Sequence, residues 1–163
     1  EFVNADEIAK GISPFQPEKV AFEAGRIMLN RIDELFKNQE SFAFETTLAT
    51  KIYKQKIKVA KENNYNTTLL FFWLRNSDLA KERVKTRVKE GGHNIPTDII
   101  ERRYVNGIKN LFDIYLEIVD QILIFDNSEG KPILIAEKNF GEEIVIHNLE
   151  KFNDLKSYYD KRG

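Results

Sequence analysis

Leu69-Leu70-Phe71-Phe72-Trp73-Leu74 is the longest apolar run in the 163 residues of this chain, and it decides the fold class. Its length suits a buried β-strand and falls far short of the ~20 residues that a membrane-spanning helix needs. A lysine-rich helix is predicted before this run, over about 51–63, and a second helix after it, over Ser77–Lys89. Helices of this length between strands are typical of βαβ crossovers, so we expect an α/β fold with a mainly parallel sheet.

The rest of the chain continues this alternation of helices and strands. Hydrophobic spacing predicts three further helices, at about 17–37, 98–120 and 149–159. Turn residues bound five short predicted strands, at 1–6, 41–45, 121–125, 133–137 and 143–147. Ser77 and Thr97 are the expected N-caps of the helices that follow them.

Composition is typical of one globular domain with its own core. Hydrophobic residues make up 42% of the chain and charged residues 31%. The absence of cysteine excludes a disulfide scaffold and a thiolate metal site, and two isolated histidines do not favour a zinc centre, so we expect no metal ligands. The sequence starts without a secretory signal pattern, which favours a cytoplasmic protein that does not enter a membrane.

Charge is distributed unevenly along the chain. The formal net charge is −1, yet the segment from Arg75 to Lys109 holds nine Lys/Arg and five Asp/Glu, a local charge of +4. This favours a phosphate-bearing ligand at one site over broad coating of nucleic acid. The alternative is an ordinary solvated helix face, which charge alone favours.

The stretch Gly91-Gly92-His93-Asn94-Ile95-Pro96 lies in this basic segment and predicts a tight turn between two helices. Two arginines lie on each side of the turn, at Arg83, Arg87, Arg102 and Arg103. The guanidinium group binds phosphate oxygens in pairs and stays charged at any working pH. We therefore expect a helical lid, over about 77–105, that closes over a polyphosphate.

Polar residues follow four of the predicted strands, at Asp6, Glu45-Thr46, Arg75-Asn76 and Asp126-Asn127. In open α/β sheets, ligands bind at the carboxyl ends of the strands. The recurrence of polar groups at these ends therefore indicates a ligand site.

A series of short motifs occurs in order along residues 1–136. They are Phe2-Val3-Asn4-Ala5-Asp6, Ser13-Pro14-Phe15, Ala24-Gly25-Arg26, Phe44-Glu45-Thr46-Thr47-Leu48, Gly91-Gly92-His93 with Pro96, Arg102-Arg103-Tyr104 and Asp126-Asn127-Ser128. Together they resemble the zeta-toxin-like P-loop kinases, and among these the bacterial proteins described as predicted ABC-type ATPases. The resemblance implies a single kinase domain that uses ATP and Mg²⁺. It also implies a small-molecule acceptor, which in zeta toxins proper is a hydroxyl of UDP-N-acetylglucosamine, and allows an antitoxin protein as a partner.

The sequence departs from the family at its beginning. The printed residues contain no G-x-x-x-x-G-K-[ST] loop to hold the phosphates, which the family would place before Glu1 together with a strand and a helix. We expect that this segment is missing, that its strand would lie centrally in the sheet, and that the chain by itself is an inactive kinase fragment.

Two functions compete with the kinase interpretation. One is a non-catalytic remnant that binds a nucleotide or a protein partner. The other is a nucleic-acid-binding domain, which is disfavoured because Tyr104 alone provides an aromatic ring among the basic residues.

The resemblance assigns roles to individual residues. Asp6 would be the general base, and Arg87 and Arg102 would neutralise charge on the transferring phosphoryl group. The acceptor would be bound by three residues, Glu45, Thr46 and Thr47. The nucleotide would be bound by four, Arg83, His93, Arg103 and Asn127.

Ordinary structural roles compete with several of these assignments. Asp6 could cap a helix that begins at Glu7, and Thr46 or Thr47 could cap the helix after them. Adjacent helical residues diverge by ~100°, so Arg102 and Arg103 do not both face one site easily. Asn127 is also a common turn residue.

Overall fold

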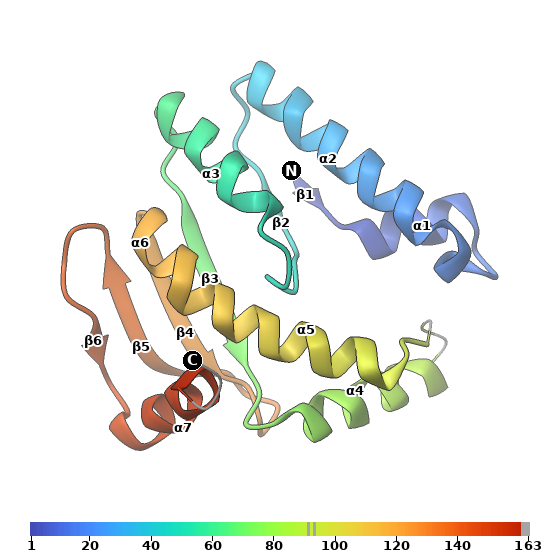
Figure 1. Ribbon diagram of the computed structural model, residues 1–163. Helices are drawn as coiled ribbons and strands as arrows, with labels where there is room; N and C mark the ends of the chain where they lie inside the picture. The colour runs from blue at the N-terminus through green and yellow to red at the C-terminus, as the bar shows by residue number, and fades with distance from the viewer. Residues whose placement is uncertain (91, 93, 161–163) are drawn as a thin grey trace. The chain divides into compact units, whose positions relative to one another are not determined.

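A computed structural model describes residues 1–90, 92 and 94–160 (Figure 1). The chain divides into two compact units. The first consists of Glu1–Thr46 and Val84–Ile95, and the second of Thr47–Arg83 and Pro96–Gly163. The predicted lid, 77–105, coincides with neither unit, because helix α4 (Ser77–Lys89) begins in the second and ends in the first.

The first unit is a short parallel strand pair packed against helices. Its elements are β1 (Phe2–Val3), α1 (Ala5–Ile12), the 3₁₀ turn η1 (Pro17–Val20), α2 (Ala21–Lys37) and β2 (Ala43–Phe44). The core of this unit is formed by six buried side chains, Val3, Ala9, Ala24, Met28, Ile32 and Leu35. The last four recur at helical spacing along one face of α2, and three of them, Ala24, Met28 and Leu35, belong to the pattern that predicted this helix.

The predicted first strand is shorter than expected. β1 ends at Val3 because Asn4 already caps helix α1, whereas the sequence pattern had extended the strand to Asp6. Pro17 does lie at the first position of a helical turn, as predicted, but that turn is 3₁₀ and the α-helix begins at Ala21.

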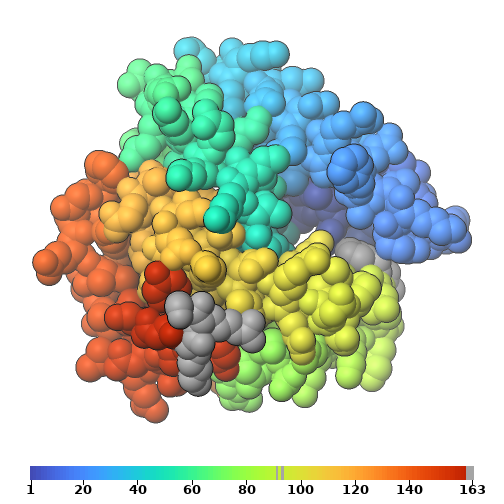
Figure 2. Space-filling model, viewed as in Figure 1, coloured from blue at the N-terminus to red at the C-terminus, as the bar shows by residue number. Residues whose placement is uncertain are grey.

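The second unit contains a four-stranded sheet and most of the helices. Its elements are α3 (Ile52–Glu62), β3 (Thr68–Trp73), α5 (Thr97–Asn110), the π-helical turn η2 (Leu111–Tyr115), α6 (Leu116–Ile118), β4 (Gln121–Asp126), β5 (Ile133–Asn139), β6 (Val145–Ile146) and α7 (Leu149–Asp160). The strand order is β3-β4-β5-β6. Figure 2 shows α7 (red) and α5 (yellow) side by side on one face of this unit.

The prediction of a mainly parallel sheet is wrong for this unit. β3 and β4 are parallel, but β4–β5 and β5–β6 are antiparallel, so the sheet is mixed. The physical reason is the length of the connections. A parallel pair needs a crossover of a dozen or more residues, which β3 and β4 have, whereas the short link 127–132 permits only a hairpin. Gly130, with φ of +81°, lies in that link.

The core of the second unit lies between the sheet and the run α5–η2–α6. Alternate residues of β4 are buried, and Ile122 and Ile124 face the core. Leu111 and Tyr115 of η2 are fully covered, and burial raises the pKa of the Tyr115 hydroxyl to about 12. The predicted helix over 98–120 is therefore present, with a π-helical segment that the sequence pattern did not reveal. Each helix in the described part of the chain is too short or too polar to span a bilayer.

Both predicted N-caps are wrong. Asn76, one residue before Ser77, accepts from the backbone N–H of Leu79 at 2.8 Å and so caps α4. Helix α5 begins at Thr97 itself, after Pro96, without a side-chain cap. In both cases several cap-forming residues are adjacent, and only the backbone path selects among them.

Gly107 allows close packing inside the second unit. A Cβ atom at this position of α5 would lie 2.7 Å from the carbonyl oxygen of Thr47. We expect Gly107→Ala to lower the free energy of unfolding by about 1–2 kcal/mol, because the steric cost exceeds the gain in helix propensity. Urea unfolding followed by circular dichroism measures this change. Gly25→Ala in α2 is the matched control, since a Cβ there meets nothing within 4 Å. A stabilising Gly107→Ala would contradict the close approach.

Candidate functional site

The carboxyl ends of β1 and β2 bring two side chains together in the first unit. The parallel register pairs Phe2 with Ala43 and Val3 with Phe44, so Asn4 and Glu45 are the next residues along each strand. The Asn4 side-chain amide donates from Nδ2 to Glu45 Oε2 at 2.7 Å. Glu45 therefore lies at a strand end, as predicted, and is held by a neighbour that the sequence analysis had not assigned to the site.

Asn4 also starts helix α1. Its Oδ1 accepts from the backbone N–H groups of Asp6 at 2.8 Å and Glu7 at 3.3 Å. Asp6 is thereby placed in the first helical turn, where the helix dipole favours a negative charge. The alternative role considered for Asp6, as the cap of a helix starting at Glu7, is wrong, because Asn4 is the cap.

Asp6 faces the predicted lid arginine Arg87. The distance from Arg87 Nη1 to Asp6 Oδ2 is 3.9 Å, and both residues belong to the first unit. The side chains are 47% and 52% exposed, respectively, so solvent screens the pair and its contribution to stability is small. Both groups consequently remain accessible to a ligand, with a proton acceptor and a phosphate-binding cation next to each other.

Helix α4 ends at Lys89, and the residues after it close the helix by a hydrogen bond back to Arg87. The Gly92 N–H donates to the Arg87 carbonyl at 2.8 Å, and a Cβ at Gly92 would lie 2.9 Å from that oxygen. A larger residue would clash at this position, so glycine is required here. The predicted role of Gly92 in ending the helix is therefore confirmed. Gly91 and the predicted nucleotide ligand His93 lie outside the described residues.

The two threonines after Glu45 belong to different units. Thr46 is exposed at the end of a segment of the first unit, and Thr47 is exposed at the start of the second. The following segment is fixed by Asn110, whose side-chain amide donates to the carbonyl of Leu48 at 2.8 Å. Neither threonine caps α3, whose N-cap position is Lys51.

Three residues predicted to contact the nucleotide lie in the described part of the second unit. Arg83 donates from Nη2 to the carbonyl oxygens of Asn127 and Ser128, so its guanidinium group joins α4 to the loop after β4. Arg103 lies on α5 next to Arg102, the predicted catalytic arginine. Both side chains are exposed, and neither makes a hydrogen bond or ion pair within the described ranges.

A buried carboxylate, Asp126, fixes the loop after β4 through hydrogen bonds and an ion pair. Asp126 is only 4% exposed, accepts from the N–H of Ser128 at 2.9 Å and from its hydroxyl, and forms an ion pair with Lys151 of α7. Burial acts to raise the pKa of Asp126, but the hydrogen bonds from Lys151 and Ser128 outweigh it, so the pKa lies below its usual value. This network positions the predicted nucleotide-binding residue Asn127.

Acid is expected to unfold the second unit through such carboxylates. The pKa of Asp120 is lowered too, because hydrogen bonds from Thr67 and Lys61 outweigh its burial. A carboxyl group whose pKa is lowered by folding stabilises the fold above its unfolded pKa of 3.8, and this contribution disappears as the pH falls through the folded pKa. The free energy of unfolding should therefore be nearly constant from about pH 5 to 7 and decrease below about pH 4. Urea titrations at each pH measure it. Asp126→Asn should make the acid decrease smaller, and an identical pH dependence in this variant would contradict the assignment.

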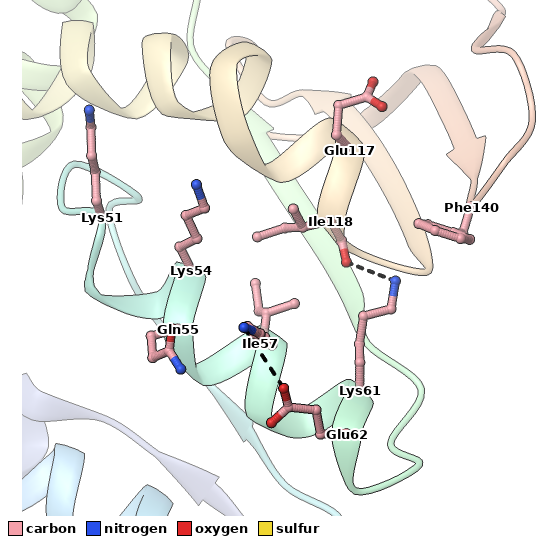
Figure 3. Close-up of a pocket in the computed structure, with 10 residues that line it drawn as sticks. Lys51, Lys54, Gln55, Ile57, Lys61, Glu62, Glu117, Ile118 and Phe140 are labelled. Atoms are coloured by element: carbon pink, nitrogen blue, oxygen red, sulfur yellow. Dashed lines mark hydrogen bonds and ion pairs between the residues drawn. The ribbon is translucent and has the colours of Figure 1, made fainter.

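A hollow of about 570 Å³ lies elsewhere in the second unit, beside α3 (Figure 3). It is lined by four lysines together with apolar and acidic side chains: Lys51, Lys54, Lys58, Lys61, Gln55, Ile57, Ile118, Phe140, Glu62 and Glu117. Lys61 is already engaged by Asp120 at 3.2 Å and by the carbonyl of Ile118 at 3.1 Å, and it lies over the Phe140 ring. None of the predicted site residues lines this hollow.

Two residues of these networks were missed by sequence analysis. Asn4 carries a recognisable signal, because an asparagine before a helix is a preferred N-cap. Lys151 carries none, since nothing local distinguishes it from other lysines of α7.

Among the described residues, no three His, Cys, Asp or Glu side chains gather in a way that could hold a metal ion. Mg²⁺ can also bind through one or two carboxylates and the phosphates of its nucleotide, so the exposed Asp6 is compatible with such an ion nearby.

This chain is similar to known proteins in three respects: a family model, a curated relative and a solved structure. The family model described as Zeta toxin matches residues 5–139. An uncharacterized protein of Haemophilus influenzae is 33% identical over 102 residues, which are 63% of this chain and 73% of that protein. A solved structure from a characterization of the PezAT chromosomal toxin-antitoxin system of Streptococcus pneumoniae matches with a TM-score of 0.57 and 13% identity. The match covers 98% of this chain and 74% of that one. At this identity the last match shows the fold alone.

Proposed function

This chain belongs to the zeta toxin family, and from that membership we propose that it carries acceptor-side and lid residues of an ATP-dependent phosphotransferase. The acceptor is a hydroxyl group of a small molecule, and a nucleotide-sugar is the class that we propose. The observation that carries the proposal is the pairing of Asp6 with Arg87 at 3.9 Å, in the same unit as Glu45.

The chemistry of these groups matches a phosphoryl transfer. The acceptor oxygen forms a bond to the γ-phosphorus while the bond between that phosphorus and the bridging oxygen of ADP breaks. Asp6 orients the attacking hydroxyl and takes its proton, and Arg87 balances the charge of the equatorial phosphoryl oxygens. A bound Mg²⁺ would neutralise further phosphate charge. Arg87 exchanges its weak pairing with Asp6 for the phosphoryl group at little energetic cost, because both side chains are about half exposed.

The acceptor is held, in this proposal, at the strand end next to Asp6. Glu45 uses one oxygen, Oε2, for Asn4, and its carboxylate has further acceptor capacity for sugar hydroxyls. Thr46 follows it directly and can donate or accept through its exposed hydroxyl. The other roles that the resemblance assigns remain predictions. They concern Thr47, Arg83, Arg102, Arg103, His93 and Asn127.

The test is a transfer assay with the protein expressed from the complete gene, because residues 1–163 contain no G-x-x-x-x-G-K-[ST] loop. ATP labelled at the γ-phosphate is offered with a panel of acceptors that includes UDP-N-acetylglucosamine, other nucleotide-sugars, free sugars and DNA ends. We expect label in a nucleotide-sugar, with Mg²⁺ required. Nucleotide binding without transfer to any acceptor would refute the kinase and favour a non-catalytic binding protein instead.

A protein partner is part of the proposal, because the structural match comes from a toxin-antitoxin system. We expect the product of a neighbouring reading frame to co-purify with the protein and to inhibit the transfer. An unchanged rate in its presence would remove the antitoxin from the proposal.

A further inference from the structure

One asparagine connects the proposed base with the proposed acceptor ligand. Asn4 lies between β1 and α1, and the two ends of its side-chain amide have different partners. The oxygen accepts from the N–H groups of Asp6 and Glu7, and the nitrogen donates to Glu45. All four residues belong to the first unit.

Most N-cap residues could not make both sets of contacts. Serine, threonine and aspartate accept from the first backbone N–H groups of a helix as well as asparagine does. Only asparagine has, on the same short side chain, an acceptor for those groups and an N–H donor for a carboxylate. The 2.7 Å contact with Glu45 is a hydrogen bond to a charged group, which is among the stronger kinds.

We propose that Asn4 is a positioning residue that fixes the acceptor-binding carboxylate of Glu45 relative to the first turn that carries Asp6. This inference rests on the function proposed above. The parallel register of β1 and β2 places the two strands side by side, and the hydrogen bond from the Asn4 amide restricts the rotamers of the Glu45 side chain. Asn4 itself contacts neither phosphate nor acceptor in this mechanism.

Asn4→Asp separates this role from ordinary helix capping. Aspartate caps α1 equally well, but it replaces the N–H donor with a negatively charged oxygen that repels Glu45. We expect KM for the acceptor to rise about tenfold or more, the equivalent of losing one hydrogen bond to a charged group, with kcat and the circular dichroism spectrum little changed. Asn4→Ser keeps the cap without reaching Glu45, and it should raise KM by a smaller factor. Equal kinetics for all three proteins would overturn the proposal.

The double variant Asn4→Asp/Glu45→Gln tests the contact itself. Donor and acceptor are exchanged, so the new amide at position 45 can donate to the new carboxylate at position 4. We expect this double variant to bind the acceptor better than the sum of the two single changes predicts. Strict additivity would overturn the contact.

A readout that needs no activity distinguishes failure of this inference from failure of the proposed function. The side-chain amide of Asn4 gives its own nitrogen–proton signals in NMR, which Asn4→Ser identifies by their loss. Glu45→Ala should shift these signals. Glu40→Ala is the matched control, because Glu40 accepts from Asn38 at 3.2 Å, so it should shift the Asn38 signals and leave those of Asn4 in place. Unmoved Asn4 signals in Glu45→Ala would refute the geometry. Shifted signals in a protein without any phosphotransfer would refute the proposed function, and with it the kinetic role of Asn4.

Discussion

Asp6→Asn is expected to lower kcat of the phosphotransfer by about 10²–10⁴-fold, the usual contribution of a positioned general base. Asparagine has nearly the same shape as aspartate but takes no proton from the acceptor hydroxyl. KM for ATP and for the acceptor should change little, because the proposed binding groups of Glu45 and the arginines are retained. The measurement is a steady-state rate with the protein from the complete gene.

Glu7→Gln is the matched control for this prediction. Glu7 is the next residue in the same acidic first turn, and it forms its own ion pair with Lys10 at 2.6 Å. The substitution removes the same charge at the same end of helix α1, but its side chain points about 100° away from that of Asp6. Its kcat should therefore stay close to that of the unaltered protein. Equal losses in the two variants would show an effect of helix-end charge and not of a general base.

Stability should not differ much between Asp6→Asn and the unaltered protein. Asp6 lies 3.9 Å from Arg87 and both side chains are about half exposed, so solvent screens this ion pair. Unfolding curves in urea check this. A large loss of stability would indicate that Asp6 has mainly a structural role, and the kinetic result would then lose its meaning.

Lys151→Met is expected to produce the largest loss of stability, about 3 kcal/mol at neutral pH. The change leaves the Asp126 carboxylate buried without its cation, and breaking such a buried pair typically costs about 3–5 kcal/mol. We place the value at the lower end because Lys151 is 31% exposed and because Ser128 still donates to Asp126. Urea unfolding, followed by the fluorescence of Trp73 in the same unit, measures the change.

The double variant Asp126→Asn/Lys151→Met is the control for charge. Its neutral amide still accepts from Ser128, and no unpaired charge remains, so much of the lost stability should return. The deficit of Lys151→Met should also shrink in mild acid, where the isolated carboxyl group takes up a proton. A double variant no more stable than Lys151→Met would show that packing of the lysine stem, and not its charge, holds the loop.

Sequence patterns located almost all helices and strands, because each has its own hydrophobic period. The apolar run around Phe71 and Phe72 forms β3, and the lysine-rich segment before it forms α3, as predicted. The limits of the elements were less accurate. β1 ends early because Asn4 turns the chain into α1, and α4 is capped by Asn76, since adjacent cap-forming residues compete on nearly equal terms.

The candidate site was predicted only as a set of residues. The register of β1 with β2, which the sequence does not contain, places Asn4 next to Glu45. The pairing of Asp6 with Arg87 joins positions 81 residues apart (87 − 6), and no local pattern encodes such a contact. Lys151 lies in a segment without family motifs, and its ion pair with Asp126 likewise joins residues that are distant in the sequence.

The sequence by itself determined the alternation of helices and strands, the α/β class and, through its motifs, the zeta toxin family. Periodicity, turn residues and motif order are local properties, so they can be read one segment at a time. Only the tertiary structure decided that the sheet is mixed, that Asn4 and not Asp6 caps α1, and which charged groups face one another. These depend on connection length, strand register and burial, which bring together residues that are distant along the chain.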